Sequence, residues 1–90
     1  MVKVYVIESL VDQTWYTGIA IDPRERLKEH NAGKNRFTKG HRPWKIIFTE
    51  AHGDWKSGRI REKYLKTSAG KKWLKKFLNR NGGDTGSLPA

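Results

Sequence analysis

The sequence predicts an α+β fold, a small three-stranded antiparallel or mixed sheet covered by about three helices. Residues 2–7 and 14–19 are rich in β-branched and aromatic side chains, and the short polar connection between them predicts a β-hairpin. A capped helix start follows at Asp22, and the last part of the sequence has the spacing of amphipathic helices. Because 90 residues can bury only a small core, we expect one domain over residues 1–80 and a disordered tail over 81–90.

The first helix has a clear start and a clear stop. Asp22 is placed as its N-cap, Pro23 occupies the first helical position, and Glu25 stands where a capping box has its acceptor. The helix should run to about Asn31 and end at Gly33. It therefore follows the hairpin directly and can pack on its sheet.

The rest of the chain consists of a polar segment followed by one strand-like and two helix-like segments. Residues 33–42 are polar, basic and glycine-containing, so we expect an exposed loop there. Residues 44–49 predict the third strand, residues 54–66 a second helix, and residues 67–79 a third helix with its apolar side chains on one face. The order is strand, strand, helix, strand, helix, helix, which allows helices to cover a small sheet and bury one face of it.

The charge of the chain points to a polyanionic partner. Lys and Arg number 19 against 9 Asp and Glu, a formal charge of +10, which favours DNA and, as a second possibility, RNA. The chain has no cysteine, so disulfides and thiolate metal sites are excluded. No apolar run approaches the ~20 residues that cross a bilayer. We expect a cytoplasmic protein without a membrane partner, either a monomer or a weak homodimer.

Tyr5 and Tyr16 stand on the two strands of the hairpin. Alternation places Tyr5 on the same side as Lys3 and Ile7, and strand pairing could bring Tyr16 close to it. Two phenols in one patch would offer groups for proton transfer. Tyrosines are also ordinary strand residues whose rings pack and whose hydroxyls bind water, and each tyrosine taken alone favours that interpretation.

Arg26 and His30 are one helical turn apart and so project from the same face. A guanidinium can stabilise charge on a phosphoryl group, and an imidazole can move a proton near neutral pH. The ordinary alternative is a solvated helix face with a cationic stripe.

Glu62 is one of few acids in the basic stretch 56–76. A single carboxylate, together with waters and a substrate phosphate, is a normal way to bind Mg²⁺. The alternative is a helical salt bridge to Lys66 at i+4, worth about 0.3–0.5 kcal/mol.

Taken together and in order, these features resemble the GIY-YIG nuclease family. Residues 4–6 (Val-Tyr-Val) and 16–18 (Tyr-Thr-Gly) resemble its two paired motifs, and residues 26–30 (Arg-Leu-Lys-Glu-His) resemble its R-L-x-x-H segment. Residues 61–66 are similar to the small single-domain branch related to the nuclease domain of the excinuclease C subunit. The resemblance extends from Tyr5 over most of the chain.

The resemblance implies a metal-dependent endonuclease that hydrolyses phosphodiester bonds in DNA. Tyr5 would serve as, or position, the general base, and Tyr16 would support the attacking water or the scissile phosphate. Arg26 would neutralise the phosphate, and His30 would join the proton network around Tyr5. Glu62 would hold one Mg²⁺ or Mn²⁺ ion.

The basic segment before the third strand and the basic faces of the last two helices are predicted to contact nucleic acid, and the segment also offers an aromatic ring for base stacking. The candidate residues of the segment are Lys34, Arg36, Phe37, Lys39 and Arg42. The alternative is a solvated loop whose charges aid solubility. No recognition helix is evident, so selectivity for DNA structure is expected rather than for sequence. The alternative function is a non-catalytic nucleic-acid-binding module with a degenerate site.

Overall fold

The computed structural model describes residues 1–81, so the predicted tail of residues 81–90 lies outside this range except for Asn81, the last residue of α4. Its elements, in chain order, are β1 (Val2–Ser9), β2 (Trp15–Ala20), α1 (Pro23–Asn31), α2 (Arg36–Lys39), β3 (Trp44–His52), α3 (Trp55–Leu65) and α4 (Ser68–Asn81). No helix of the described part is long and apolar enough to cross a membrane.

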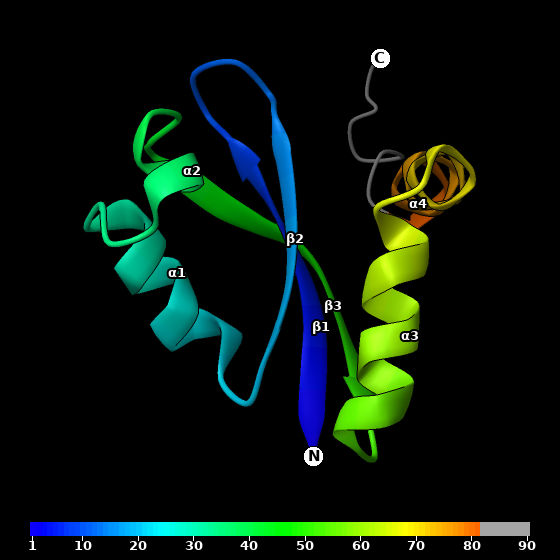
Figure 1. Ribbon diagram of the computed structural model, residues 1–90. Helices are drawn as coiled ribbons and strands as arrows, with labels where there is room; N and C mark the ends of the chain where they lie inside the picture. Colours follow the sequence, from blue (N-terminus) through cyan, green and yellow to red (C-terminus); the bar gives the residue numbers. More distant parts are fainter. Residues whose placement is uncertain (82–90) are drawn as a thin grey trace.

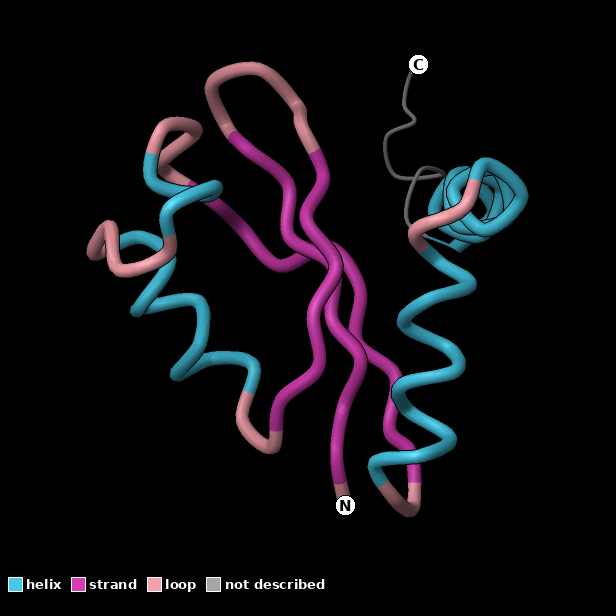
Figure 2. The backbone as a smooth tube through the Cα atoms, in the orientation of Figure 1, coloured by secondary structure: helices cyan, strands magenta, loops and turns pink. Residues whose placement is uncertain are grey.

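The three strands form one antiparallel sheet in the order β2-β1-β3, so β1 is its middle strand. Helices α1 and α2 lie on one side of this sheet, and α3 and α4 lie on the other (Figure 1). The tube in Figure 2 shows the same two layers, with α4 turned sharply away from α3. The predicted α+β class is confirmed, and the sheet is antiparallel.

Strand β1 is buried on both faces, whereas the sequence led us to expect burial of one. Val4 and Val6 face α3 and α4, where they pack with three other buried apolar residues, Phe48, Leu65 and Leu74. Tyr5 and Ile7 face α1 and pack with Ala20 and Trp44. Because helices cover both sides of the sheet, the side chains on the two faces of β1 enter two separate cores. The second core contains a polar residue, Tyr5.

The start and stop of α1 are as predicted. The Asp22 carboxylate accepts hydrogen bonds from the backbone N–H groups of Arg24 and Glu25, and Pro23 begins the helix. Gly33 follows the helix with a φ of +83°, a left-handed conformation that favours glycine. The predicted capping-box partner, Glu25, instead accepts a hydrogen bond from Lys28.

Residues 33–42 are not the continuous loop that we predicted from their composition. They contain α2, a single helical turn. The side chain of Asn35 accepts a hydrogen bond from the Thr38 backbone N–H at 3.0 Å and so caps this turn. The helix is too short to show apolar periodicity, which is why the pattern of the segment did not reveal it.

Candidate active site

A buried chain of three polar side chains links the sheet to α1 and α2. The Tyr5 hydroxyl lies 3.0 Å from His30 Nε2, and His30 Nδ1 lies 2.8 Å from the Thr38 hydroxyl. Tyr5 and His30 are each 1 % exposed, and Thr38 is 0 % exposed. A neutral imidazole has one donor and one acceptor nitrogen, and both hydroxyls can take either role. Both ring nitrogens of His30 are therefore satisfied without water.

Tyr16 reaches the same histidine from β2. Strand register places Tyr16 opposite Ile7, and Gly18 opposite Tyr5. Tyr16 is thus diagonal to Tyr5, and its ring centroid is 4.9 Å from that of His30. The two tyrosines lie in one patch, as the alternation of the strands allowed, and both of their rings lie next to the imidazole ring of His30.

Gly18 supplies the space that Tyr5 occupies. A Cβ atom at residue 18 would lie 2.5 Å from the Tyr5 hydroxyl oxygen, closer than such contacts can be. Gly18 belongs to the second of the two motifs but was not among the predicted site residues. The sequence did hold a signal for this contact, because a glycine inside a strand often marks the close approach of another group.

Burial is the main reason why both proton-carrying groups are neutral near pH 7. Burial raises the pKa of Tyr5, and the neighbouring Arg26 guanidinium opposes that rise. Burial also lowers the pKa of His30 from its ordinary 6.5, and the positive charge of Arg26 adds to the effect. Arg26 itself donates a hydrogen bond to Glu29 and remains partly exposed. A neutral phenol therefore faces a neutral imidazole, with a cation beside them.

Glu62 comes from α3, in the other helical layer, and is 7 % exposed. Its carboxylate lies 3.3 Å from Lys66 Nζ, so the helical salt bridge considered as an alternative is present. Its negative charge adds a small contribution to the raised pKa of Tyr5, after the larger effect of burial.

The donor chemistry at Glu62 fits one hard cation. Within residues 1–81 no group of three or more His, Cys, Asp or Glu residues could form a metal cage. Mg²⁺ does not need such a cage, since it commonly uses one or two carboxylates, retained waters and a substrate phosphate. Glu62 is the carboxylate that the family resemblance predicts to bind the ion.

Hydrogen bonds around Trp44 hold α1 and α2 in place over the sheet. The Asn31 side chain accepts from the Trp44 backbone N–H at 2.7 Å and donates to its carbonyl oxygen at 3.2 Å. The Trp44 indole N–H donates to the Thr38 carbonyl oxygen at 2.8 Å. These contacts fix the helices that carry His30 and Thr38, a supporting role that the sequence did not indicate.

The predicted nucleic-acid contacts are spread over α2 and its flanks. Lys34 lines a small pocket of about 120 Å³ together with Arg26 and His30. Phe37 is 51 % exposed, and its ring stacks 6.0 Å from that of Tyr16. The other three candidates, Arg36, Lys39 and Arg42, are exposed, and the Arg42 guanidinium donates to the Lys39 carbonyl oxygen. Lys34 and Phe37 are thus the members that border the buried chain.

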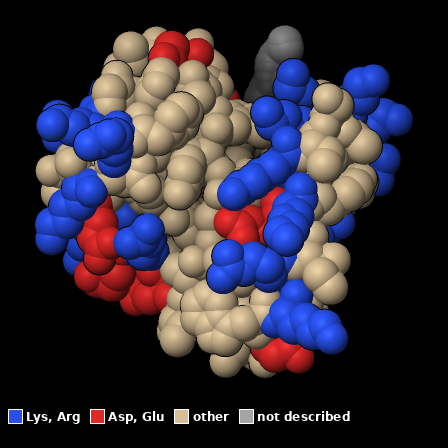
Figure 3. Space-filling view, viewed as in Figure 1, with Lys and Arg blue, Asp and Glu red and all other residues tan. Residues whose placement is uncertain are grey.

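A second basic surface covers α3 and α4. Figure 3 shows Lys and Arg side chains gathered over these helices. Its exposed residues include Lys56, Arg59, Lys63, Lys66, Lys71, Lys72, Lys75 and Lys76. The sequence had indicated basic faces on these helices, but only the fold shows that they flank the site from the side opposite α2.

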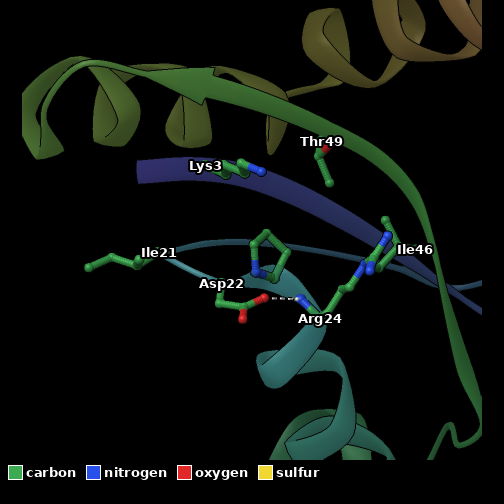
Figure 4. Close-up of a pocket in the computed structure, with 7 residues that line it drawn as sticks. Lys3, Ile21, Asp22, Arg24, Ile46 and Thr49 are labelled. Atoms are coloured by element: carbon green, nitrogen blue, oxygen red, sulfur yellow. Dashed lines mark hydrogen bonds between the residues drawn. The ribbon is translucent and has the colours of Figure 1, made fainter. Parts of the chain in front are cut away.

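A wider groove of about 730 Å³ opens between the start of α1 and strands β1 and β3 (Figure 4). Lys3 and Thr49 line it from the sheet, and Ile21 and Arg24 line it from the start of α1. None of the residues that line it belongs to the predicted site. This groove is therefore separate from the buried chain.

Thr38→Val is expected to destabilise the fold by about 1–3 kcal/mol, because it leaves His30 Nδ1 buried without a partner. Urea denaturation of the two proteins measures the difference. The same change at the exposed Thr49 should stay within about 0.5 kcal/mol of wild type. Equal effects at the two threonines would mean that the Thr38 hydroxyl is not part of a buried network.

Comparison with known proteins identifies the family of this chain. The family model described as the GIY-YIG catalytic domain matches residues 1–77, and the chain belongs to this family. The solution structure of a UPF0213 protein from Bacillus halodurans is similar over 100 % of this chain and 99 % of that chain, with 28 % sequence identity and a TM-score of 0.57.

Two curated relatives are UPF0213 proteins of halophilic archaea. The protein of Haloquadratum walsbyi is 38 % identical over 45 residues, which are 49 % of this chain and 49 % of that protein. The protein of Halobacterium salinarum is 48 % identical over 44 residues, 48 % of this chain and 56 % of that protein. The chain spans about half the length of the curated relatives it matches.

Proposed function

We propose that this protein is an endonuclease that hydrolyses phosphodiester bonds in DNA with the help of one Mg²⁺ or Mn²⁺ ion. The observation that carries the proposal is the buried Tyr5–His30–Thr38 chain with Arg26 beside it. Family membership supports a nuclease, and the net charge of +10 supports a polyanionic substrate.

The buried chain supports a proton path away from the attacking water. With its proton on Nδ1, His30 donates to Thr38, and Nε2 accepts the proton of the Tyr5 hydroxyl. As the water oxygen attacks phosphorus, the water proton passes to the Tyr5 oxygen, and the Tyr5 proton passes to His30. The bond from phosphorus to the leaving oxygen breaks. Coupling the two transfers avoids a free phenolate, which burial disfavours.

Tyr16 and Arg26 would form the mouth of the site. Tyr5 is 1 % exposed, so water and phosphate must approach through neighbours that are partly exposed, and both of these residues are. Arg26 would neutralise the phosphate, and Tyr16 would hold the water or the phosphate in line. Glu62 would bind the metal ion, which supplies Lewis-acid stabilisation of the leaving oxygen.

The distribution of positive charge supports selectivity for DNA structure over sequence. Basic residues flank the site on α2 and on α3–α4, where they can contact backbones that approach from two directions (Figure 3). Phosphate contacts of this kind position a nucleic acid but carry no base information.

A nucleic-acid-binding module without turnover is the second candidate, and one observation favours it. Arg26 is paired with Glu29, and Glu62 is paired with Lys66, so both charged members of the site are engaged by neighbours. If these pairs persist in the complex, neither residue is available to the phosphate or to a metal ion.

Cleavage of a labelled panel of single-stranded, duplex, flap and branched DNA tests the proposal. We expect products with Mg²⁺ or Mn²⁺, no products with EDTA, and unequal rates among the structures. Denaturing gels resolve the products, and mobility shifts in EDTA report binding on the same substrates. Binding without product in either metal would overturn the nuclease assignment in favour of the binding module.

A further inference from the structure

A pocket of about 290 Å³ opens beside the site, between the edge strand β2, helices α2 and α4, and the turn that follows α3. We call it the hairpin pocket, and it is lined by Trp15, Tyr16, Thr17, Phe37, Lys66 and Lys71. Tyr16 forms a wall of this pocket and also packs against His30, with ring centroids 4.9 Å apart. A molecule in the pocket would therefore be separated from the buried chain by the Tyr16 ring.

The walls of the hairpin pocket are aromatic. The Tyr16 and Phe37 rings lie 6.0 Å apart at an interplanar angle of 28°, and Phe37 leaves half of its surface exposed. The Trp15 indole N–H donates to the Glu8 carboxylate at 3.0 Å, which fixes the orientation of its ring. Exposed rings held in a pocket are platforms on which flat, apolar faces stack.

Lysines stand at the rim of the same pocket. Lys66 and Lys71 line it, and an adjoining pocket of about 330 Å³ shares Trp15 and Lys71 and adds Lys75. Lys66 is the C-cap residue of α3, and Lys71 and Lys75 belong to α4. We call these three pocket-lining residues the lysine track. Aromatic platforms beside a cationic track are the usual combination for single-stranded nucleic acid, whose unstacked bases are free to enter.

We propose that the hairpin pocket receives an unpaired nucleobase of the substrate, with Phe37, Tyr16 and Trp15 stacking on the base and the lysine track holding the adjacent phosphates. The inference rests on the nucleic-acid partner of the proposed function and narrows it to strands with an unpaired nucleotide next to the scissile bond. A fully paired duplex keeps its bases stacked inside and offers nothing to this pocket.

Fluorescence anisotropy in EDTA tests the pocket without turnover. The probes are a labelled single strand and the same strand with its central bases replaced by abasic sites, which keeps the phosphate charge and removes the rings. We expect wild type to bind the intact strand at least about fivefold more tightly than the abasic strand, the lower end of the range for base–aromatic stacking. Phe37→Ala should reduce that ratio and leave affinity for the abasic strand unchanged.

Matched variants separate stacking from charge and from misfolding. Phe37→Tyr keeps the ring and should preserve the ratio, and Trp55→Ala removes a similarly exposed ring on α3 outside the pocket and should also preserve it. Lys71→Ala should weaken binding of both strands equally and reduce the salt slope by about 0.7, the value for one phosphate contact on a single strand.

Equal binding of the intact and abasic strands by wild type would overturn the base pocket, and so would an equal loss on both strands in Phe37→Ala. Because this readout needs no cleavage, its failure leaves the endonuclease proposal standing. Conversely, a base preference without metal-dependent products would support the pocket and reject the nuclease.

Discussion

Glu62→Gln is expected to lower metal-dependent cleavage at least about a hundredfold, because Lewis-acid stabilisation is worth several kcal/mol and each 1.36 kcal/mol is tenfold in rate. The substitution keeps the size of the side chain and removes the charge that would hold the ion. Single-turnover cleavage of the best DNA substrate in Mg²⁺ and in Mn²⁺ measures the effect. DNA binding should be retained or slightly stronger, since the surface becomes more positive.

Glu25→Gln is the matched control for this prediction. It removes the same charge from an exposed carboxylate whose partner is Lys28, so cleavage should remain at the wild-type level. Glu62→Ala should behave like Glu62→Gln. Cleavage that survives both changes at residue 62 would show that Glu62 does not hold the ion.

Tyr5→Phe is expected to reduce cleavage by about 10²–10⁴, the usual worth of a positioned acid–base group. The ring still fills its place against Gly18, so the loss would come from the missing hydroxyl. The variant should also lose about 1–3 kcal/mol of stability, because His30 Nε2 is left buried without its partner. Single-turnover rates and urea denaturation measure the two effects independently.

Tyr64→Phe removes a hydroxyl from an exposed tyrosine on α3 and should leave cleavage unchanged. Cleavage by Tyr5→Phe within tenfold of wild type would remove Tyr5 from the proton path and leave it a packing role.

The pH profile provides a separate check of the same path. His30 must be neutral to accept a proton, and its pKa is lowered from 6.5. The acid limb of kcat/KM for wild type should therefore lie below pH 6.5. A limb above this value would require a different accepting group.

Local chemistry was enough to predict much of the fold from the sequence. Asp22 and Pro23 marked the start of α1, because an N-cap is a contact between residues two or three positions apart. The β-branched residues of β1 and β2 gave the hairpin for a similar reason. These features depend on near neighbours, which the sequence displays directly.

What escaped prediction depends on contacts between distant residues. Thr38 looked like one more polar residue in a basic segment, and only the packing of α2 over α1 shows that it binds His30. The approach of Tyr5 to Gly18 needed the register of the hairpin, which spacing alone leaves open. The roles of Tyr5, Arg26 and His30 were implied by a family resemblance, and the fold brings Tyr5 into contact with His30 and places Arg26 beside His30.

The position of Tyr5 on the middle strand of the sheet has a consequence for motion. Amide hydrogens of β1 are expected to exchange with deuterium only through opening of most of the domain, since both faces of that strand are covered. Those of the four-residue helix α2, which carries Phe37, should exchange through small local openings. The protein would then combine a rigid central strand, which carries Tyr5, with a more mobile helix α2. DNA of different shapes could then displace α2 without moving Tyr5.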